Sequence, residues 1–360
     1  MIRILFLIIV LAHGLIHLIG FAKAFNYGNI TQITKEISKP SGILWLLTAF
    51  LLIGAAILYL LKKDASLIFG LIAVIISQIL IFTVWKEAKF GTIANIIILA
   101  AVVLNWGSLR FEKGYQKDVL ENLRRTNALK MGLLTELDVL PLPEPVQRYL
   151  RYSGVLNKPK LKNVRVVFEG QMRDKGKDFF PFTCEQYNFF DEPTRLFFMK
   201  GKMKGFTVPG YHKYSNAAAK MDIRLFGLFS VARLSGVNAT KVETVTLFND
   251  MCLVAPATLI DKRITWQSID SNSAKATFTN HAITISAILY FNEKGQLIDF
   301  TSNDRDINQY LFSTPVGKYK NINGVNIMTY GETIWYYPDG KFVYGKFNFK
   351  EIDYNVSEMN

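Results

Sequence analysis

The sequence has very few of the residues that metal centres and nucleophilic active sites use. Its 360 residues include two cysteines, Cys184 and Cys252, and four histidines. Two cysteines are too few for a disulfide framework or a cysteine-ligated zinc site, and they are either two buried thiols or one disulfide. No phosphate-binding loop, dinucleotide fingerprint or G-x-S-x-G nucleophile elbow is present, and the charged cluster Asp299–Asp306 is more typical of a solvated turn with an ion pair. We therefore expect no catalytic residues, no metal ligands and no cofactor, and the sequence offers no argument for an enzyme.

Acidic residues are also scarce relative to basic ones. The chain has 29 Asp and Glu against 42 Lys and Arg, a formal net charge of +13. Such an excess suits either nucleic acid or anionic lipid headgroups. Because no nucleic-acid-binding motif accompanies the charge, we expect membrane lipids and not nucleic acid as partners. A lipophilic ligand or a protein partner is the further alternative.

Long apolar runs, in contrast, fill the first 109 residues. They are Ile2–Phe21, Ser41–Leu61, Ala65–Trp85 and Gly91–Leu109. A bilayer core of roughly 30 Å requires about 20 apolar helical residues, and each run supplies close to that number. Helices satisfy their own backbone hydrogen bonds in lipid, and short turns between runs favour antiparallel neighbours. The sequence therefore predicts a four-helix transmembrane bundle over residues 1–109.

Basic residues at the ends of these runs indicate the orientation. Six of them lie on the side of the N-terminus and five on the opposite side. Cytoplasmic flanks carry the excess of Lys and Arg in membrane proteins. The difference of one charge therefore favours a cytoplasmic N-terminus and a cytoplasmic C-terminal domain.

Residues 110–140 are expected to form a juxtamembrane basic helix and a linker. The stretch Arg110–Leu134 has helical spacing, and Arg124 and Arg125 are its candidate membrane-surface residues. Each basic residue near an anionic surface contributes about 1 kcal/mol. The alternative is a solvated connector that continues the fourth helix. Pro145 then begins a short helix that Gly154 ends.

After Lys160 the hydrophobic period changes to two. In Ile283–Leu289, for example, Ile, Ile, Ala and Leu occupy every second position, and turn sequences recur between such stretches. One helix is expected at Val245–Val254, before Pro256. For residues 141–360 we predict a soluble β-rich domain, built on a large curved antiparallel sheet with one or two packed helices. The fold class of the whole chain is membrane α plus β.

The stretch Lys200–Phe206 combines lysines, small residues and apolar anchors, and further aromatic and apolar residues lie nearby, within residues 197–229. The stretch dips towards a membrane or gates a hydrophobic pocket, or else it forms an edge strand that its lysines protect from pairing. The 27 Phe and 16 Tyr of the chain are likewise compatible with an aromatic core or with a cavity for an acyl chain. The candidate ligand-binding residues are Phe197, Phe206, Tyr211, Leu225, Phe226 and Phe229, and further candidate membrane-surface residues are Lys200, Lys202 and Lys204.

His13 and His17 lie inside the first apolar run. Four residues apart, they project from the same face of a helix. Ionisable groups inside a membrane span are candidate functional groups, so a redox or metal site is one interpretation. The other is a hydrogen bond that specifies how the helices pack.

Several stretches of the chain resemble a group of uncharacterised bacterial multi-pass membrane proteins. The residues His13–Gly20 resemble their first span, and Leu142–Leu150, with Gly154, resembles the opening of their C-terminal β-rich domain. Phe180–Phe182 and Trp335–Gly340 match that pattern as well. The resemblance implies a location in the bacterial inner (cytoplasmic) membrane. It supplies no catalytic residues, because the family has no assigned activity. Its β-domain is distantly similar to the half-barrels of lipoprotein carriers, which hold lipid between a curved sheet and helices, although fold alone does not imply function.

Three functions are compatible with these features, in order of preference. In the first, the β-domain of an integral membrane protein binds a lipid, lipoprotein or other hydrophobic ligand at the membrane surface, which requires an apolar cavity. In the second, the β-domain is a protein-interaction or sensor module on a membrane anchor, which requires an exposed apolar patch. The third is a membrane redox or metal protein that uses His13 and His17.

Overall fold

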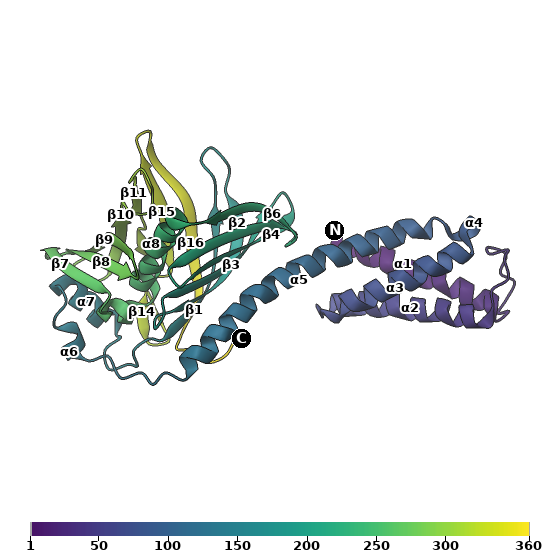
Figure 1. Cartoon of the computed structure of the whole chain (residues 1–360), viewed down its shortest axis with the longest axis horizontal. Helices are drawn as coiled ribbons and strands as arrows, with labels where there is room; N and C mark the ends of the chain where they lie inside the picture. Colours follow the sequence, from purple (N-terminus) through teal and green to yellow (C-terminus); the bar gives the residue numbers. More distant parts are fainter. Residues whose placement is uncertain (1, 360) are drawn as a thin grey trace. The chain divides into compact units, whose positions relative to one another are not determined.

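The structure, a computed structural model, describes residues 2–359, and the chain divides into two compact units (Figure 1). The first unit ends at Arg110 and is helical. The second begins at Phe111 and is built on a β-sheet.

The first unit contains four helices that are long and apolar enough to cross a membrane. They are α1 (Ile2–Ala24), α2 (Lys39–Leu60), α3 (Ala65–Thr83) and α5 (Gly91–Asn127), and the single turn α4 (Trp85–Ala88) follows α3. Ser38 caps the amino end of α2, where its hydroxyl accepts a hydrogen bond from the amide of Ser41. The expectation of four apolar N-terminal helices is confirmed.

Most of the surface of these helices is apolar. At most 33% of the residues in each apolar stretch are buried, and large side chains such as Phe50, Phe82 and Ile96 face outward. A helix that is apolar on all sides suits a membrane or the interior of a large protein. The four helices are therefore consistent with a membrane protein.

Helix α5 continues without a break from the first unit into the second. It ends at Asn127 and not at the expected Leu134, and a chain of turns follows. Its last four turns carry Phe111, Tyr115, Val119 and Leu123 at a spacing of four, which places them on one face. This face is buried against the convex side of the sheet, on the side chains of Tyr187, Phe189, Leu196 and Phe198. The end of α5 is thus part of the β-domain's own packing.

The second unit is built on one 14-stranded antiparallel sheet. Its strands are β1 (Asn163–Met172), β2 (Phe180–Phe189), β3 (Thr194–Met203), β4 (Phe206–Ser215), β5 (Ala218–Leu225), β6 (Phe229–Ser235), β7 (Ile264–Asp270), β8 (Ser273–Asn280), β9 (Ile283–Phe291), β10 (Leu297–Ser302), β11 (Leu311–Ser313), β12 (Val316–Gly317), β15 (Tyr330–Tyr337) and β16 (Gly340–Tyr354). The spatial order is β6-β5-β4-β3-β2-β1-β16-β15-β11-β10-β9-β8-β7, with β12 beside β15, so the sheet is open and β6 and β7 are its edges. A separate hairpin joins β13 (Lys320–Ile322) to β14 (Val325–Ile327). The expected large antiparallel sheet is confirmed.

Helix α8 (Val237–Val254) joins the two edge strands and lies in the hollow of the curved sheet (Figure 1). The expected helix, Val245–Val254, is its carboxyl half. The helix begins two turns earlier because tertiary contacts hold residues of weak helix propensity there. The hydroxyl of Thr240, for example, accepts a hydrogen bond from the amide of Ala219 on β5.

Three short helices complete the domain. They are α6 (Glu136–Val139), α7 (Glu144–Ser153) and the 3-10 helix η1 (Pro256–Ile260). The expected signals of α7 are confirmed: Pro145 lies in its first turn, and Gly154 ends it with a φ of +68°. That left-handed conformation favours glycine, because a side chain at this φ is strained.

The sheet buries side chains on both faces where β2, β3 and β4 run side by side. Successive residues of a strand point to opposite faces. On β3, Phe197 therefore faces the concave side and α8, while Leu196 and Phe198 face the convex side and the end of α5. This alternation decides which residues of the segment 197–229 reach the interior of the curved sheet.

Candidate functional site

A cavity of about 140 Å³ lies between α8 and the concave face of the sheet. The aromatic part of its wall is organised around Phe168, whose ring centroid is 5.1 Å from that of Phe349 and 5.8 Å from that of Phe347. Strand register causes this contact, since β1 and β16 pair Phe168 directly with Phe349. The apolar lining consists of Val166, Phe168, Met172, Phe197, Leu253, Val254, Phe312, Phe347 and Phe349.

Helix α8 contributes a polar stripe to the same cavity. Glu243, Thr246 and Asp250 recur at a spacing of three and four residues, so they share one helix face, and all three line the cavity. Buried polar side chains require hydrogen-bond partners. The strands opposite α8 supply most of them.

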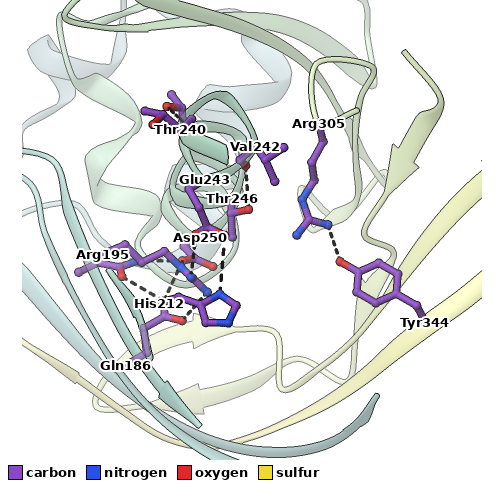
Figure 2. A network of polar contacts seen from close by, with 12 residues as sticks. Gln186, Arg195, His212, Thr240, Val242, Glu243, Thr246, Asp250, Arg305 and Tyr344 are labelled. Carbon is purple, nitrogen blue, oxygen red and sulfur yellow. Dashed lines mark hydrogen bonds and ion pairs between the residues drawn. The ribbon is translucent and has the colours of Figure 1, made fainter. Parts of the chain in front are cut away.

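Arg195 on β3 is the main partner of this stripe. Its guanidinium donates to Asp250 Oδ2 at 2.7 Å, to Glu243 Oε2 at 3.1 Å and to Gln186 Oε1 at 3.0 Å. Only 7% of the Arg195 side chain is exposed. Figure 2 shows these groups gathered where α8 faces β2, β3 and β4. The ion cluster therefore ties the helix to the sheet.

Glu243 is ionised in this cluster. Burial alone would raise the pKa of Glu243, but the positive charge of Arg195, helped by His212 and Arg305, lowers it to about 2. His212 Nδ1 lies 3.8 Å from Glu243 Oε1. The carboxylates of Glu243 and Asp250 thus share the guanidinium of Arg195.

Arg305, in the loop after β10, lines the same cavity. It donates a hydrogen bond to the hydroxyl of Tyr344. Its guanidinium carbon lies 4.1 Å from the ring centroid of Phe312, 5.7 Å from that of Trp335 and 5.8 Å from that of Tyr344. Cation–π attraction to these rings stabilises the charge. Within residues 2–359 no carboxylate pairs with it.

Four buried polar atoms on the cavity wall have no hydrogen-bond partner within the described residues. They are His212 Nε2, Asn249 Oδ1, Arg305 Nε and Thr333 Oγ1. A buried polar atom without a partner costs about 1–3 kcal/mol, and native structures contain few of them. Their convergence on one cavity is typical of a site that a polar ligand group completes.

The predicted ligand-binding residues fall in three places. Phe197 lines the cavity. Tyr211 lies on the convex face, where its hydroxyl donates to Asp118 Oδ2 at 2.6 Å. The remaining four lie at the β4–β5–β6 end of the sheet and do not line the cavity; there Phe206 and Phe226 are in contact, at 5.5 Å between ring centroids. The structure therefore brings only Phe197 to the cavity, together with residues that the pattern did not single out.

The predicted membrane-surface residues are mostly at the surface of the domain. Lys202, Lys204 and Arg124 are exposed. Lys200 pairs with Glu112 at 2.8 Å, and Arg125 pairs with Asp191 at 2.7 Å. Their contact with headgroups stays a prediction.

The alternative interpretation of the lysine-rich segment as an edge strand is wrong. The stretch Lys200–Phe206 comprises the end of β3, the turn after it and the first residue of β4, and both strands are internal, since β3 pairs with β2 and β4, and β4 pairs with β3 and β5. The interpretation of residues 299–306 as a solvated turn with an ion pair holds for Asp304, which pairs with Lys241 at 2.8 Å. It is wrong for Arg305, which lines the cavity.

His13 and His17 belong to a hydrogen-bonded network within the helical unit. His13 Nε2 lies 2.9 Å from Asn95 Oδ1, and His17 Nε2 lies 2.9 Å from Ser77 Oγ. Asn95 in turn donates to Gln78 at 3.0 Å. Such bonds between helices specify packing inside an apolar bundle. Among residues 2–359, no group of three or more His, Cys, Asp or Glu side chains is arranged to hold a metal ion.

Cys184 and Cys252 are free thiols in the core of the β-domain. Burial raises the pKa of both thiols. A thiol that stays protonated is a poor nucleophile. Of the two alternatives from the sequence, the structure contains two buried thiols and not a disulfide.

An open antiparallel sheet that curves around one helix, with a part-aromatic, part-polar cavity between them, defines the class of this β-domain. The chain belongs to a family of unknown function (DUF6544), which residues 132–347 match. The match covers the cavity-lining strands and α8, and ends within β16. Comparison with curated proteins gave no match.

Two solved structures are similar to the chain. A LolA-superfamily protein from Nitrosomonas europaea has 9% sequence identity, covers 58% of this chain and 92% of its own, and gives a TM-score of 0.35. A β-barrel-like protein of the domain of unknown function DUF1849 from Brucella abortus has 9% identity, covers 54% of this chain and 98% of its own, and gives a TM-score of 0.17. Similarity at this level says nothing about a ligand.

Proposed function

We propose that this protein is anchored in the bacterial inner membrane by its four apolar helices and that its β-domain binds a lipid-like amphiphile in the α8 cavity. The observation that carries the proposal is the convergence of four unpartnered polar atoms on a cavity that also has an apolar wall of aromatic and aliphatic side chains. An apolar ligand would leave these atoms unsatisfied, and a purely polar one would gain nothing from the Phe168 wall.

The size of the cavity limits how the ligand lies. A dry cavity of about 150 Å³ in another protein holds one benzene molecule. The present cavity, about 140 Å³, therefore encloses a polar head with the first part of a chain. Each further methylene that leaves water contributes about 0.8 kcal/mol, so longer chains gain affinity where they reach apolar surface beyond the head.

A cavity-filling substitution tests this function. Thr246 lines the cavity from α8, and its hydroxyl donates only to the carbonyl of Val242 at 3.0 Å. Thr246→Phe is expected to displace the ligand, because the ring occupies its space. Native mass spectrometry of the full chain, extracted from membranes, measures this as the loss of a bound mass that the wild type releases on denaturation.

The matched control is Val237→Phe, on the same helix but 80% exposed. Lipid that adheres to the apolar helices is present in both variants. The difference in bound mass between them therefore measures the ligand in the cavity. Overpacking costs about 1–3 kcal/mol, so circular dichroism must show that Thr246→Phe is folded. Equal bound mass in wild type, Thr246→Phe and Val237→Phe would refute the proposed function.

A second candidate function is a protein-interaction module. The edge strand β6 is exposed along its whole length, and Phe229, Val231 and Leu234 are 64%, 59% and 47% exposed. Exposed apolar edges are typical sites of strand addition by a partner. This function requires no ligand in the cavity, so a bare wild-type mass in the same experiment would favour it.

A further inference from the structure

The loop that carries Arg305 is held in place by its neighbour Asp304. One carboxylate oxygen of Asp304 accepts from the Ser286 amide on β9 at 2.7 Å, and the other pairs with Lys241 on α8 at 2.8 Å. The position of the loop is thereby fixed to the sheet and to α8 before any ligand arrives. Preorganised groups bind with less loss of entropy.

Most of the hydrogen-bonding capacity of Arg305 is unused. A guanidinium has five N–H donors. Within residues 2–359, the only hydrogen-bond partner of the Arg305 side chain is the Tyr344 hydroxyl. Its Nε is among the four unpartnered buried atoms. The Tyr344 oxygen accepts from Arg305, so its own O–H remains available to a second acceptor. Adjacent free donors on a cation are suited to a carboxylate or phosphate.

The opposite end of the cavity already contains two carboxylates. Glu243 and Asp250 both pair with the guanidinium of Arg195 there, so an anionic group at that end would lie beside two carboxylates. Figure 2 shows Arg305 and Tyr344 set apart from this cluster. The cavity therefore has a polarity that directs a negative group towards Arg305 and away from α8.

From this polarity we infer that the amphiphile is anionic and that Arg305, with Tyr344, holds its carboxylate or phosphate head. The inference rests on the proposed function and adds the chemical class of the ligand. The chain of the ligand then lies on the Phe168–Phe347–Phe349 wall, next to Tyr344 on β16. Arg305 binds the ligand and performs no covalent step.

The experiment compares amphiphiles of one chain length and different heads. Isothermal titration of the full chain in amphipol measures the binding of decanoate, decan-1-ol and decylamine, with inorganic phosphate as the chain-free anion. We expect decanoate to bind at least about tenfold more tightly than decan-1-ol, because hydrogen bonds between charged groups contribute more binding free energy than neutral ones. Arg305→Met is expected to abolish this preference, and Arg305→Lys to retain part of it.

Arg173→Met is the matched control. Arg173 also stacks on aromatic rings, with its guanidinium carbon 4.4 Å from the centroid of Phe179, but does not line the cavity. Its removal should leave the preference for decanoate unchanged. The comparison of decanoate with decan-1-ol in the wild type needs no variant, so a misfolded Arg305→Met would not block the test.

Each other outcome has a distinct meaning. Equal binding of decanoate and decan-1-ol, unaffected by Arg305→Met, overturns the anionic head and leaves the proposed function standing. Tightest binding of decylamine overturns it too, and places a cation at the Glu243 end. Phosphate binding as tight as that of decanoate assigns the site to a soluble anion and overturns the amphiphile. No binding of any probe contradicts the proposed function itself.

Discussion

Replacement of Arg195 by Met is expected to destabilise the β-domain by about 3–5 kcal/mol. The substitution leaves the carboxylates of Glu243 and Asp250 in the interior without their common cation, and an uncompensated buried charge carries a cost of this size. Hydrogen exchange on the full chain measures the effect locally, as an increase of at least about a hundredfold in the exchange rates of α8 and β3 amides at neutral pH.

The control for Arg195→Met is Lys200→Met on the same strand. It removes the Lys200–Glu112 pair, whose side chains are 44% and 31% exposed, and exposed pairs contribute at most about 1 kcal/mol. Equal exchange rates in the two variants would contradict a structural role for the Arg195 cluster.

The dependence of stability on pH provides a second test of the same cluster. The pKa of Glu243 is lowered to about 2 from its usual value of 4.5. Ionised Glu243 therefore contributes stability that is complete above pH 4.5 and is lost as the pH falls towards 2. In the Arg195→Met variant this part of the acid dependence should disappear, because the cation that lowers the pKa is absent.

Replacement of Phe248 by Ala is expected to have an effect of similar size, by a different cause. Phe248 on α8 is fully buried; its ring stacks on that of Phe278 at 5.3 Å and meets Phe300 edge-on at 5.9 Å. Removal of a buried aromatic ring costs about 3–5 kcal/mol. Since this contact holds α8 over the sheet, hydrogen exchange of α8, β8 and β10 should rise together.

Phe229→Ala provides the matched control for this substitution. Phe229 is 64% exposed on the edge strand β6, and surface substitutions usually change stability by less than about 0.5 kcal/mol. If Phe248→Ala raised the exchange of α8 alone and left β8 and β10 unchanged, the helix would not be clamped to the sheet by this contact.

The sequence predicted those parts of the fold that depend on a local pattern of residues. Apolar length alone identified the four helices, because a helix that faces lipid needs no polar face. The alternating residues of Ile283–Leu289 identified β9, because a sheet with one buried face has a period of two. The first two turns of α8 were missed, because contacts such as Thr240 with Ala219 stabilise them and composition does not.

The cavity could not be predicted in this way, because its polar residues are distant from one another in the sequence. Arg195, Glu243 and Arg305 meet only after the sheet has curved and α8 has crossed from one edge to the other. Two local signals existed: Arg195 lies two residues before Phe197 and so on the same face of the strand, and Glu243, Thr246 and Asp250 recur at helical spacing on one face of α8. Neither signal specifies a partner without the fold.

The most direct test of the account is to locate the ligand by photolabelling. A fatty acid with a diazirine near its carboxyl end is incubated with the full chain in membranes, irradiated, and mapped by peptide mass spectrometry. We expect label on the cavity residues of β1, β16 and α8, such as Phe168, Phe347 and Leu253. Unlabelled decanoate should compete with the probe and reduce this labelling. Label confined to the apolar helices up to Arg110, or to the edge strand β6, would contradict it.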